Sequence, residues 1–396
     1  MVFAGKTRKI CIATPEYPPD QWGGLARTVF RVAHHARDMG MDVHVAHVSV
    51  GTDPFVLLDE NRESRMDEGV SIHRLTVARE EIPLNQRDLW ECPHNLTLLM
   101  MYQSLEKLYR SERFDLLHSF FLYPVGYVTG LLARRMRVPS VLTVVGNDVK
   151  KYIFSPEKAA VCRSGLENAD RIVALSRDLQ EMADALTPVA DKCRIIYNSV
   201  EPPEEQWAPR ERGNGPFRIG CAGIFKYAKG LPYLFKAVAE LNRAHEVEVQ
   251  LVGHVRPSER KAYEESLVKT GIGHVVQLLE PLPHPDVPQW LRGLDAFVLP
   301  SVSEGCPNIL MEALASGVPS VATRTGANEE LIEDRVSGLL IPWGDSASLA
   351  SALTALVENP GLGQALGPAG RRKMAEFSVR RERRAWESLY RELVDI

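Results

Sequence analysis

Short runs of β-branched and aliphatic residues alternate with helical patterns along nearly the whole chain, and this alternation restricts the possible folds most strongly. The strand-like runs are almost continuously apolar, whereas strands of a half-exposed antiparallel sheet alternate apolar and polar residues. The sequence therefore predicts parallel sheets covered by helices on both faces. In the first half we expect strands at 9–13, 43–50, 70–75, 115–118, 140–145, 171–174 and 194–197, and helices at 25–39, 95–110 and 124–136.

Residues 201–216, EPPEEQWAPRERGNGP, interrupt this pattern. Four prolines, six charges and two glycines in this stretch oppose both a strand and a packed helix. We therefore predict two doubly wound domains joined by a hinge, with the carboxyl ends of their strands, where such sheets bind ligands, facing each other across a cleft. Beyond the break we expect strands at 217–223, 247–252, 275–279, 296–299, 320–323 and 338–341, and helices at 231–244, 257–270, 309–316 and 347–358.

Composition narrows the functional class. A length of 396 residues suits two domains, and a net charge of −4 provides no basic field for nucleic acid. The six cysteines show neither zinc-site spacing nor a disulfide framework. The N-terminal apolar stretch is too short for a secretory signal, and no window reaches the roughly 18–20 apolar residues of a membrane span. We expect a cytoplasmic protein.

The C-terminal stretch 371–393 carries eight Lys and Arg residues on a helical pattern interrupted by glutamates. A solvated last helix and a basic patch for peripheral contact with a membrane are both open interpretations of this stretch.

Residues 299–319, LPSVSEGCPNILMEALASGVP, read as a strand, a turn and a helix. Glu304 lies in the turn and Glu312 lies inside the helix, with seven residues between them. Backbone N–H groups of such a turn and helix start can approach an anion, for which a diphosphate is the obvious candidate. A carboxylate further along can accept two ribose hydroxyls, as acidic residues do in dinucleotide folds. Spacing alone leaves open that the two glutamates are unrelated surface residues.

The longer string SVSEGCPNILMEALASGVPSVAT resembles the E-x₇-E signature of family-four retaining glycosyltransferases. PEYPPDQWGGLARTV, IIYNSVE, VPQWLRGLDAFVLPS and TGANEELIEDRVSGLLIP resemble further family motifs in the same order. The resemblance covers nearly the whole chain and is strongest over 215–345. It implies a GT-B fold of two Rossmann-like domains, with an acceptor-binding domain at 1–200, a hinge at 201–216, a donor-binding domain at 217–375 and a C-terminal helix at 376–396 that packs back on the first domain.

The resemblance assigns the donor diphosphate to Lys229 of GIFKYAKG and places Glu304 near the donor sugar and its leaving phosphate. The family usually has an arginine where this chain has Ile224, and Lys226 is the expected substitute cation. A lysine fixes a phosphate less firmly than the bidentate fork of arginine. The expected donor-binding set also contains the glycine pair of the first loop and the motif helix, namely Gly23, Gly24, Gly305, Asn308, Ile309 and Glu312.

A second departure concerns the loop TVVGNDVKKY, where many family members have a histidine in place of Val145. Asp148 or Asn147 is the candidate to hold a sugar hydroxyl there. The alternative is that these two residues only form a turn. His118, at the end of an expected strand, is a further catalytic candidate facing the cleft or else a packed core residue. Trp22, His73, His94 and Tyr123 are weaker candidates for an acceptor pocket.

The implied reaction is front-face substitution, in which the departing phosphate accepts the acceptor's proton and the protein supplies positioning and electrostatics. Closure about the hinge would exclude water. The chain contains no Asp-x-Asp string, so no metal is expected. Apart from the donor, a nucleotide-diphosphate sugar with UDP or GDP, no cofactor is expected, and the acceptor is expected to be a small molecule, a glycan or a lipid-linked molecule. The base, the sugar and the acceptor are not fixed by the sequence.

Other functions use the same architecture. Sugar-nucleotide epimerases and phosphorylases share it, but the ordered motifs favour neither. The sequence argues against a nicotinamide dehydrogenase, because no G-x-G-x-x-G string stands at the start of an expected helix. A catalytically silent sugar-nucleotide-binding subunit is the alternative from a different class, and the missing arginine and histidine are the features that favour it.

Overall fold

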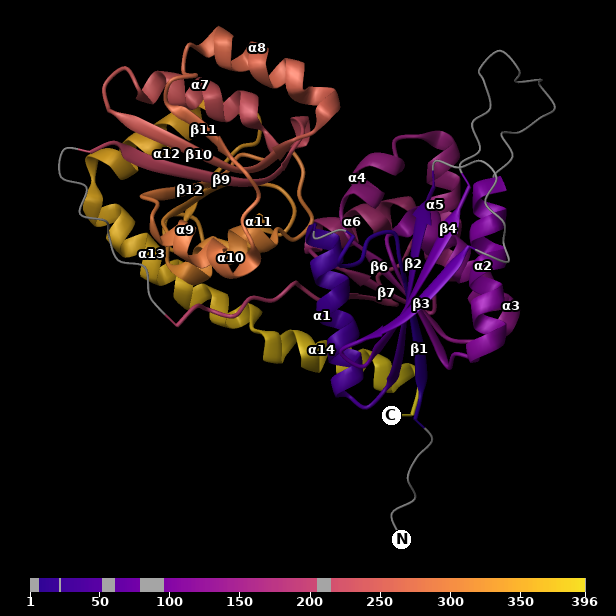
Figure 1. The fold of residues 1–396 in the computed structure, drawn as a ribbon. Helices are drawn as coiled ribbons and strands as arrows, with labels where there is room; N and C mark the ends of the chain where they lie inside the picture. The colour runs from indigo at the N-terminus through magenta and orange to yellow at the C-terminus, as the bar shows by residue number, and fades with distance from the viewer. Residues whose placement is uncertain (1–6, 21–22, 52–60, 79–95, 205–214, 396) are drawn as a thin grey trace, which may run out of the picture. The chain divides into compact units, whose positions relative to one another are not determined.

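The computed structural model describes residues 7–20, 23–51, 61–78, 96–204 and 215–395, which form two compact units (Figure 1). The first unit contains Met1–Ile196 and Arg383–Ile396, and the second contains Tyr197–Glu382. Each unit has one mainly parallel sheet with helices on its faces, so the two α/β domains predicted from the sequence are confirmed. The chain passes from the first unit to the second between Ile196 and Tyr197, before the hinge expected at 201–216. Residues 205–214 of that hinge lie outside the described residues.

The sheet of the first unit has the strand order β3-β4-β2-β1-β5-β6-β7-β8. Its strands run parallel except for β3, which pairs antiparallel with β4 at the edge. The order reverses between β1 and β5, and ligands of such sheets bind beyond the carboxyl ends at a reversal of this kind. The strands are β1 (Lys9–Thr14), β2 (Asp42–Val50), β3 (Arg62–Asp67), β4 (Val70–Val77), β5 (Leu116–Phe120), β6 (Ser140–Val144), β7 (Arg171–Ala174) and β8 (Cys193–Ile195).

Two apolar layers cover this sheet. On one face the α1 side chains Val29 and Val32 pack with Trp386 and Tyr390 of α14, and all four are fully buried. On the other face α2 and α3 pack through a separate cluster. The end of the chain is therefore part of the first unit's core. The helices are α1 (Gly24–Asp38), α2 (Leu96–Glu112), the π-helical turn η2 (Leu122–Gly126), α3 (Tyr127–Met136), α4 (Asn147–Tyr152), α5 (Pro156–Asn168), α6 (Arg177–Leu186) and α14 (Val379–Leu393).

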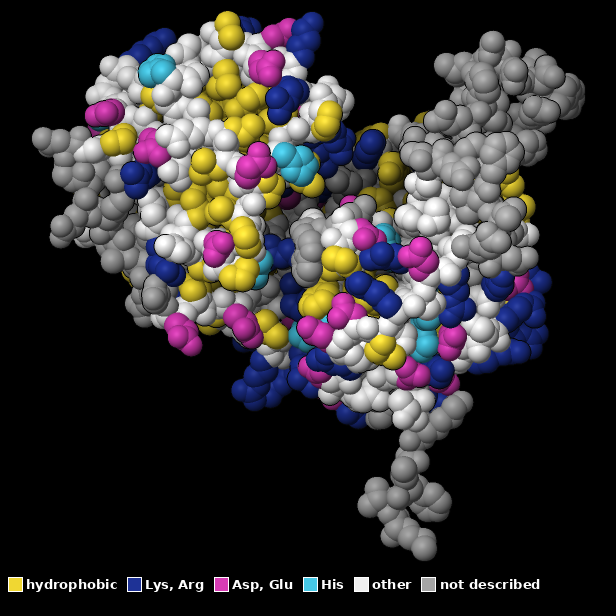
Figure 2. Space-filling model, viewed as in Figure 1, with side chains coloured by type: hydrophobic (Ala, Val, Ile, Leu, Met, Phe, Trp, Pro, Cys, Tyr) yellow, Lys and Arg dark blue, Asp and Glu magenta, His cyan; other side chains and the backbone are white. Residues whose placement is uncertain are grey.

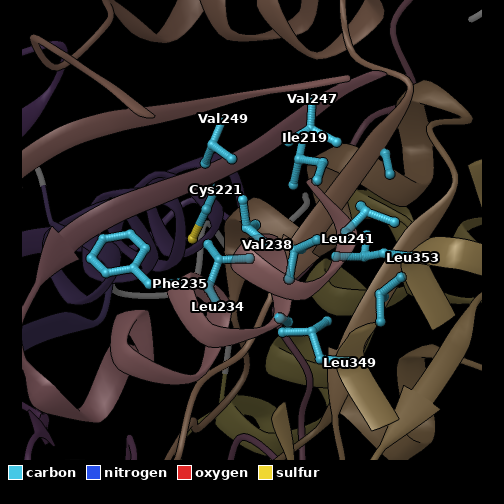
Figure 3. Close-up of a cluster of buried hydrophobic side chains, with 14 of the residues drawn as sticks. Ile219, Cys221, Leu234, Phe235, Val238, Leu241, Val247, Val249, Leu349 and Leu353 are labelled. Atoms are coloured by element: carbon cyan, nitrogen blue, oxygen red, sulfur yellow. The ribbon is translucent and has the colours of Figure 1, made fainter. Parts of the chain in front are cut away.

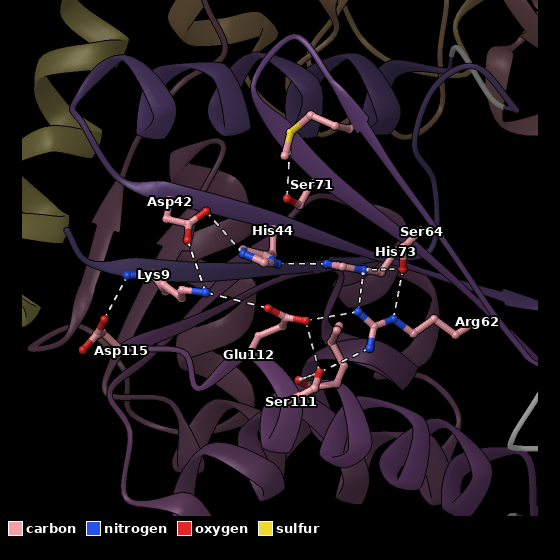
Figure 4. Close-up of polar contacts among 12 residues, drawn as sticks. Lys9, Asp42, His44, Arg62, Ser64, Ser71, His73, Ser111, Glu112 and Asp115 are labelled. Carbon is pink, nitrogen blue, oxygen red and sulfur yellow. Dashed lines mark hydrogen bonds and ion pairs between the residues drawn. The ribbon is translucent and has the colours of Figure 1, made fainter.

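A partly buried polar network lies between this sheet and α2 (Figure 4). Arg62 Nη2 lies 3.2 Å and Ser64 Oγ 2.8 Å from Nδ1 of His73, and Nε2 of His73 lies 2.9 Å from Nδ1 of His44. Because a guanidinium only donates, His73 accepts at Nδ1 and donates from Nε2 to His44. Burial, helped by the Arg62 charge, lowers the pKa of His73 to about 4. The rings of His44 and His73 are stacked and buried, with 5% and 4% of the residues exposed, so His73 is not accessible to an acceptor substrate.

The sheet of the second unit has the order β11-β10-β9-β12-β13-β14, and every pair is parallel. Its order reverses between β9 and β12, which places the loops after these two strands at the expected ligand-binding edge. The strands are β9 (Phe217–Phe225), β10 (Val247–Val255), β11 (Val276–Leu279), β12 (Ala296–Leu299), β13 (Ser320–Thr323) and β14 (Leu339–Ile341).

Helices cover both faces of this sheet as well. They are the 3₁₀ turns η3 (Tyr227–Lys229), η4 (Pro257–Glu259), η5 (His284–Asp286) and η6 (Ala375–Phe377) and the helices α7 (Leu231–Leu241), α8 (Arg260–Thr270), α9 (Val287–Arg292), α10 (Asn308–Ser316), α11 (Asn328–Leu331), α12 (Ser346–Glu358) and α13 (Pro360–Met374). Within the described part of the chain, no helix combines the length and the apolar character that crossing a membrane requires.

The core of the second unit joins β9 and β10 to α7 and α12 (Figure 3). Ile219 of β9 and Val249 of β10 face Leu234 of α7 and Leu349 and Leu353 of α12, and all five are 0% exposed. Truncating a fully buried leucine to alanine typically costs about 2–5 kcal/mol. This packing holds the strand ends that carry the candidate site in a fixed arrangement.

Candidate functional site

The loops that follow β9 and β12 come into close contact at Gly230. This residue has φ +70°, and a Cβ atom there would lie 1.9 Å from the carbonyl oxygen of Pro300. Val302 also donates its N–H to the Ala228 carbonyl at 2.8 Å. Only glycine combines that backbone conformation with so close an approach. The contact brings η3, and with it Lys229, against the turn that follows β12.

Lys229 and Glu304 form an ion pair in this contact. Lys229 Nζ donates to Glu304 Oε1 at 2.6 Å, and the Ser301 hydroxyl donates to the same oxygen at 2.6 Å. The side chains of Lys229 and Glu304 are 19% and 10% exposed, and Ser301 is fully buried. The structure therefore brings together two predicted site residues and adds Ser301, which the sequence analysis missed. Its position in the LPS string before the turn was the available signal.

The loop after β13 supports the Glu304 turn from the other side. Thr323 Oγ1 donates to the Ser301 carbonyl at 2.5 Å. Gly326 has φ +57°, and a Cβ atom there would lie 2.5 Å from the carbonyl oxygen of Glu304 and 2.6 Å from that of Gly305. The turn is thus fixed by β13 as well as by β12, which favours a preformed anion-binding loop.

The segment that enters the second unit also contacts this loop. The amide of Asn198 donates to the Cys306 carbonyl at 2.8 Å, and the Tyr197 hydroxyl donates to Glu330 Oε1 at 3.0 Å. Both residues belong to the IIYNSVE string. Through Asn198 the string holds the backbone that precedes α10, and through Tyr197 it contacts α11.

The predicted ribose-binding carboxylate, Glu312, lies in α10 and is 12% exposed. His284 Nε2 approaches its Oε1 at 3.5 Å from the turn η5. Gly305, Asn308 and Ile309, predicted to bind the donor, are half-buried at the start of the same helix. The backbone N–H groups at the start of a helix favour an anion there.

Lys226 is placed differently from the expectation. It lines a cavity of about 60 Å³ between α7 and α8, together with Tyr227, Glu259 and Tyr263. Figure 2 shows hydrophobic side chains gathered over α7 and the adjoining part of α8. The structure therefore places Lys226 in the wall of this cavity rather than against Glu304. Ile224, in the position of the family arginine, is 43% exposed.

In the first unit, Gly23 and Gly24 lie at the start of α1, after the carboxyl end of β1 and beside the reversal of strand order. The Gly23 carbonyl accepts the N–H of Arg27 at 3.1 Å. A Cβ atom on Gly23 would lie 3.2 Å from Glu16 Oε2, so a larger residue would crowd this carboxylate. The preceding residues 21–22, with Trp22, lie outside the described part of the chain, as does His94.

Asp148 is a structural residue, and the prediction that it holds a sugar hydroxyl is wrong. Its carboxylate is fully buried and accepts the backbone N–H groups of Leu122 at 3.1 Å, Val145 at 3.0 Å, Gly146 at 2.6 Å and Val149 at 3.1 Å. Burial raises the pKa of Asp148, and these bonds oppose the shift. The carboxylate ties the loop after β5 to the loop after β6 and is occupied. The side chain of Asn147 lies outside the described part of the structure.

His118 is also a core residue, so the prediction that it faces a cleft is wrong. Its ring is 0% exposed, with Nδ1 2.8 Å from the Tyr390 hydroxyl and Nε2 2.8 Å from the Thr143 hydroxyl. Burial lowers the pKa of His118 to about 3, which keeps it neutral. The residue helps to fix α14 on the sheet of the first unit.

Comparisons with known proteins agree with this arrangement. A family model described as Glycosyltransferase Family 4 matches residues 22–203, and one described as Glycosyl transferases group 1 matches residues 216–359. The D-inositol 3-phosphate glycosyltransferase of Corynebacterium jeikeium is 32% identical over 308 residues, which are 71% of this chain and 73% of that protein. The chain belongs to glycosyltransferase family 4.

Solved structures support the fold of this family-four glycosyltransferase. Sucrose-phosphate synthase (tll1590) from Thermosynechococcus elongatus superposes with a TM-score of 0.77 at 19% identity, covering 98% of this chain and 99% of that one. Anabaena Alr3699/HepE in complex with UDP superposes with a TM-score of 0.76 at 19% identity, covering 97% and 100%. The GT-B fold predicted from the resemblance is confirmed.

Proposed function

We propose that this glycosyltransferase moves a sugar from a UDP-sugar to an acceptor hydroxyl, with retention of configuration at the anomeric carbon. The observation that carries the proposal is the cluster of Lys229, Glu304 and Ser301 where the strand order of the second sheet reverses. The choice of uridine draws on Anabaena HepE, whose structure contains UDP.

Lys229 is suited to bind the donor diphosphate. An ammonium has three hydrogen-bond donors, and the bond to Glu304 Oε1 uses one of them. The remaining donors can serve phosphate oxygens in a setting where the lysine side chain is only 19% exposed. Electrostatic interactions are stronger in such a poorly solvated site than in water. Glu312 completes the donor site by accepting the ribose hydroxyls.

The proposed mechanism is a front-face substitution without metal or covalent intermediate. The bond between the anomeric carbon and the phosphate oxygen breaks, the acceptor oxygen bonds to the same face of that carbon, and the departing phosphate takes the acceptor's proton. Lys229 stabilises the charge that develops on the phosphate. Glu304 is held by Lys229 and Ser301, and its role is to fix the ammonium and contact the donor sugar.

The acceptor belongs to the first unit in this proposal. Beyond β5 and β6 the rings of Tyr123 and Tyr152 lie 5.6 Å apart, and the Lys158 ammonium lies 4.8 Å from the Tyr152 ring centroid. Half-buried aromatic rings beside a cation suit a hydroxylated ring that carries an anionic group. The name of the Corynebacterium relative, a D-inositol 3-phosphate glycosyltransferase, fits an acceptor of this class.

Two measurements test the proposal. A thermal-shift screen compares UDP-, GDP- and ADP-sugars, because a ligand at 100 times its dissociation constant adds about 2.7 kcal/mol of stability. Nuclear magnetic resonance then follows transfer to inositol phosphates and simple glycosides and reports the anomeric configuration of the product. Stabilisation by UDP-sugars and a retained configuration are expected. An inverted product would overturn the mechanism, and no response to any nucleotide sugar would overturn the donor site.

A further inference from the structure

The segment PLPHP, residues 281–285, follows β11 and leads into η5. Three of its five residues are prolines, which fix their own φ angle and restrict the residue before them. His284 lies between two of these prolines, so its backbone has little freedom. Its side chain is 63% exposed, which means that the core does not require an imidazole here.

This exposed ring nevertheless contacts a mostly buried carboxylate on another element. His284 Nε2 lies 3.5 Å from Oε1 of Glu312, whose side chain is 12% exposed. A glutamate has three rotatable side-chain bonds, and fixing them costs entropy. The His284 ring, carried by a backbone that prolines restrict, lies 3.5 Å from one oxygen of the carboxylate and restrains it before any ligand arrives. Restraining a binding group in advance raises affinity for the group that it recognises.

We propose that His284 is a positioning residue that orients Glu312 for the ribose hydroxyls and so sets the preference for ribonucleotide over 2′-deoxyribonucleotide donors. This inference rests on the proposed function, in which Glu312 accepts those hydroxyls. A site built to bond a hydroxyl rejects an analogue that lacks it, because its own polar group is then left unmatched. The rejection is sharp only if the carboxylate cannot turn away, and His284 restrains that rotation.

The test compares the wild-type protein with H284A, H284Q and H274A. Glutamine keeps an N–H donor of similar reach, whereas alanine removes it. His274 is an exposed histidine before β11, at the opposite end of the strand from His284, and serves as the matched control. Isothermal titration gives dissociation constants for UDP and 2′-deoxy-UDP, with GDP and 2′-deoxy-GDP as a second pair of probes.

We expect the wild-type protein to prefer the ribonucleotide by about tenfold or more, since each tenfold step corresponds to about 1.4 kcal/mol. H284A should reduce this ratio to about threefold or less, mostly by weakening ribonucleotide binding, while H284Q keeps most of the preference. In transfer assays H284A should raise the donor KM and leave kcat within about twofold, because the lost restraint acts on donor binding rather than on the reacting atoms. H274A should match the wild-type protein in every respect.

The outcomes separate the two claims. An H284A ratio equal to that of the wild-type protein overturns the role of His284 and leaves the donor site standing. Binding of neither UDP nor GDP to the wild-type protein overturns the proposed function, and the role of His284 falls with it. Loss of kcat alone in H284A, with an unchanged ratio, would also contradict the inference. Because His284 is 63% exposed, melting curves of H284A and H284Q should match the wild-type curve.

Discussion

Lys229 Nζ lies 2.6 Å from Glu304 Oε1, so the cation expected to serve the donor diphosphate is already paired with a carboxylate of the same site. Exposed ion pairs contribute little to protein stability. This pair is largely buried, and the Ser301 hydroxyl donates to the same Glu304 oxygen. The ammonium is therefore already in place when the donor binds. The donor's interaction energy does not have to be spent on moving the lysine.

Replacing Lys229 by methionine should abolish most transfer. Removing one preorganised group that stabilises developing charge typically lowers kcat by about 10²–10³, and we expect a loss of that size in initial rates. Lys261 is the matched control, since its side chain is 88% exposed and forms an exposed ion pair with Glu265 in the same helix. Transfer by Lys229→Met at the rate of Lys261→Met would contradict the role of Lys229.

Ser301→Ala should lower kcat more than it changes the donor KM. The variant removes a hydrogen bond to an ionised carboxylate, which is typically worth about 1.5–3 kcal/mol, and so predicts a loss of roughly tenfold or more. The bond from Thr323 to the Ser301 carbonyl is kept, so the loop backbone should stay in place. Ser316→Ala, a buried serine at the end of α10, is the control. Equal kinetics in the two variants would show that Ser301 is not needed for positioning.

A comparison of Gly230→Ala with Gly271→Ala distinguishes the cost of a strained backbone conformation from the cost of a steric clash at the new Cβ atom. Both glycines have φ +70°, but a Cβ atom at Gly271 meets nothing within 4 Å whereas one at Gly230 lies 1.9 Å from the Pro300 carbonyl. A left-handed conformation costs a non-glycine residue about 1–2 kcal/mol, which is the loss expected for Gly271→Ala with full activity. Gly230→Ala should lose more stability and also transfer. Denaturant unfolding and rate assays measure both effects, and identical behaviour of the two variants would refute the close approach.

Stability should fall in mild acid because buried histidines are held neutral. The pKa of His118 is lowered by burial to about 3 from an ordinary value of 6.5. Below pH 6.5 the unfolded chain therefore gains a proton that the folded protein does not. His118 therefore costs no stability above pH 6.5, and the free energy of unfolding decreases as the pH falls from 6.5 towards 3. At pH 5 the loss from this residue is on the order of 2 kcal/mol.

Urea unfolding at pH 7.5 and pH 5.0 measures this effect. The wild-type protein should lose stability between the two values, and His118→Gln should lose less of it, even though the variant is less stable at pH 7.5. His73, with a pKa of about 4, should contribute in the same direction. The exposed His274→Ala serves as the control. The same pH dependence in His118→Gln and the wild-type protein would show that His118 is not the group responsible.

The sequence predicted the parallel strands because a strand buried on both faces leaves a continuous apolar run. It missed β3, RESRMD, because this edge strand is exposed along nearly its whole length and has no apolar pattern to detect. Its pairing is decided by β4, whose apolar run was recognised. Edge strands of this kind depend on tertiary context rather than on their own composition.

The residues of the candidate site were likewise predicted only in part. Lys229 and Glu304 were predicted from motifs on loops after strands, and the fold brings them into contact. Asp148 and His118 were misplaced because a polar residue after or at the end of a strand looks the same in sequence whether it faces a ligand or satisfies buried groups. Burial and bonding partners distinguish the two cases, and neither can be read from a single sequence.

Titration of UDP into the purified protein and into Lys229→Met is the decisive measurement. We predict that one UDP binds per wild-type chain, that Lys229→Met weakens binding by about tenfold or more, and that Lys261→Met leaves it unchanged, since one charged contact is worth about 1.4 kcal/mol or more. Equal affinity of the wild-type protein and Lys229→Met for UDP would contradict the assignment of the donor diphosphate to the second unit's Lys229 and Glu304 cluster.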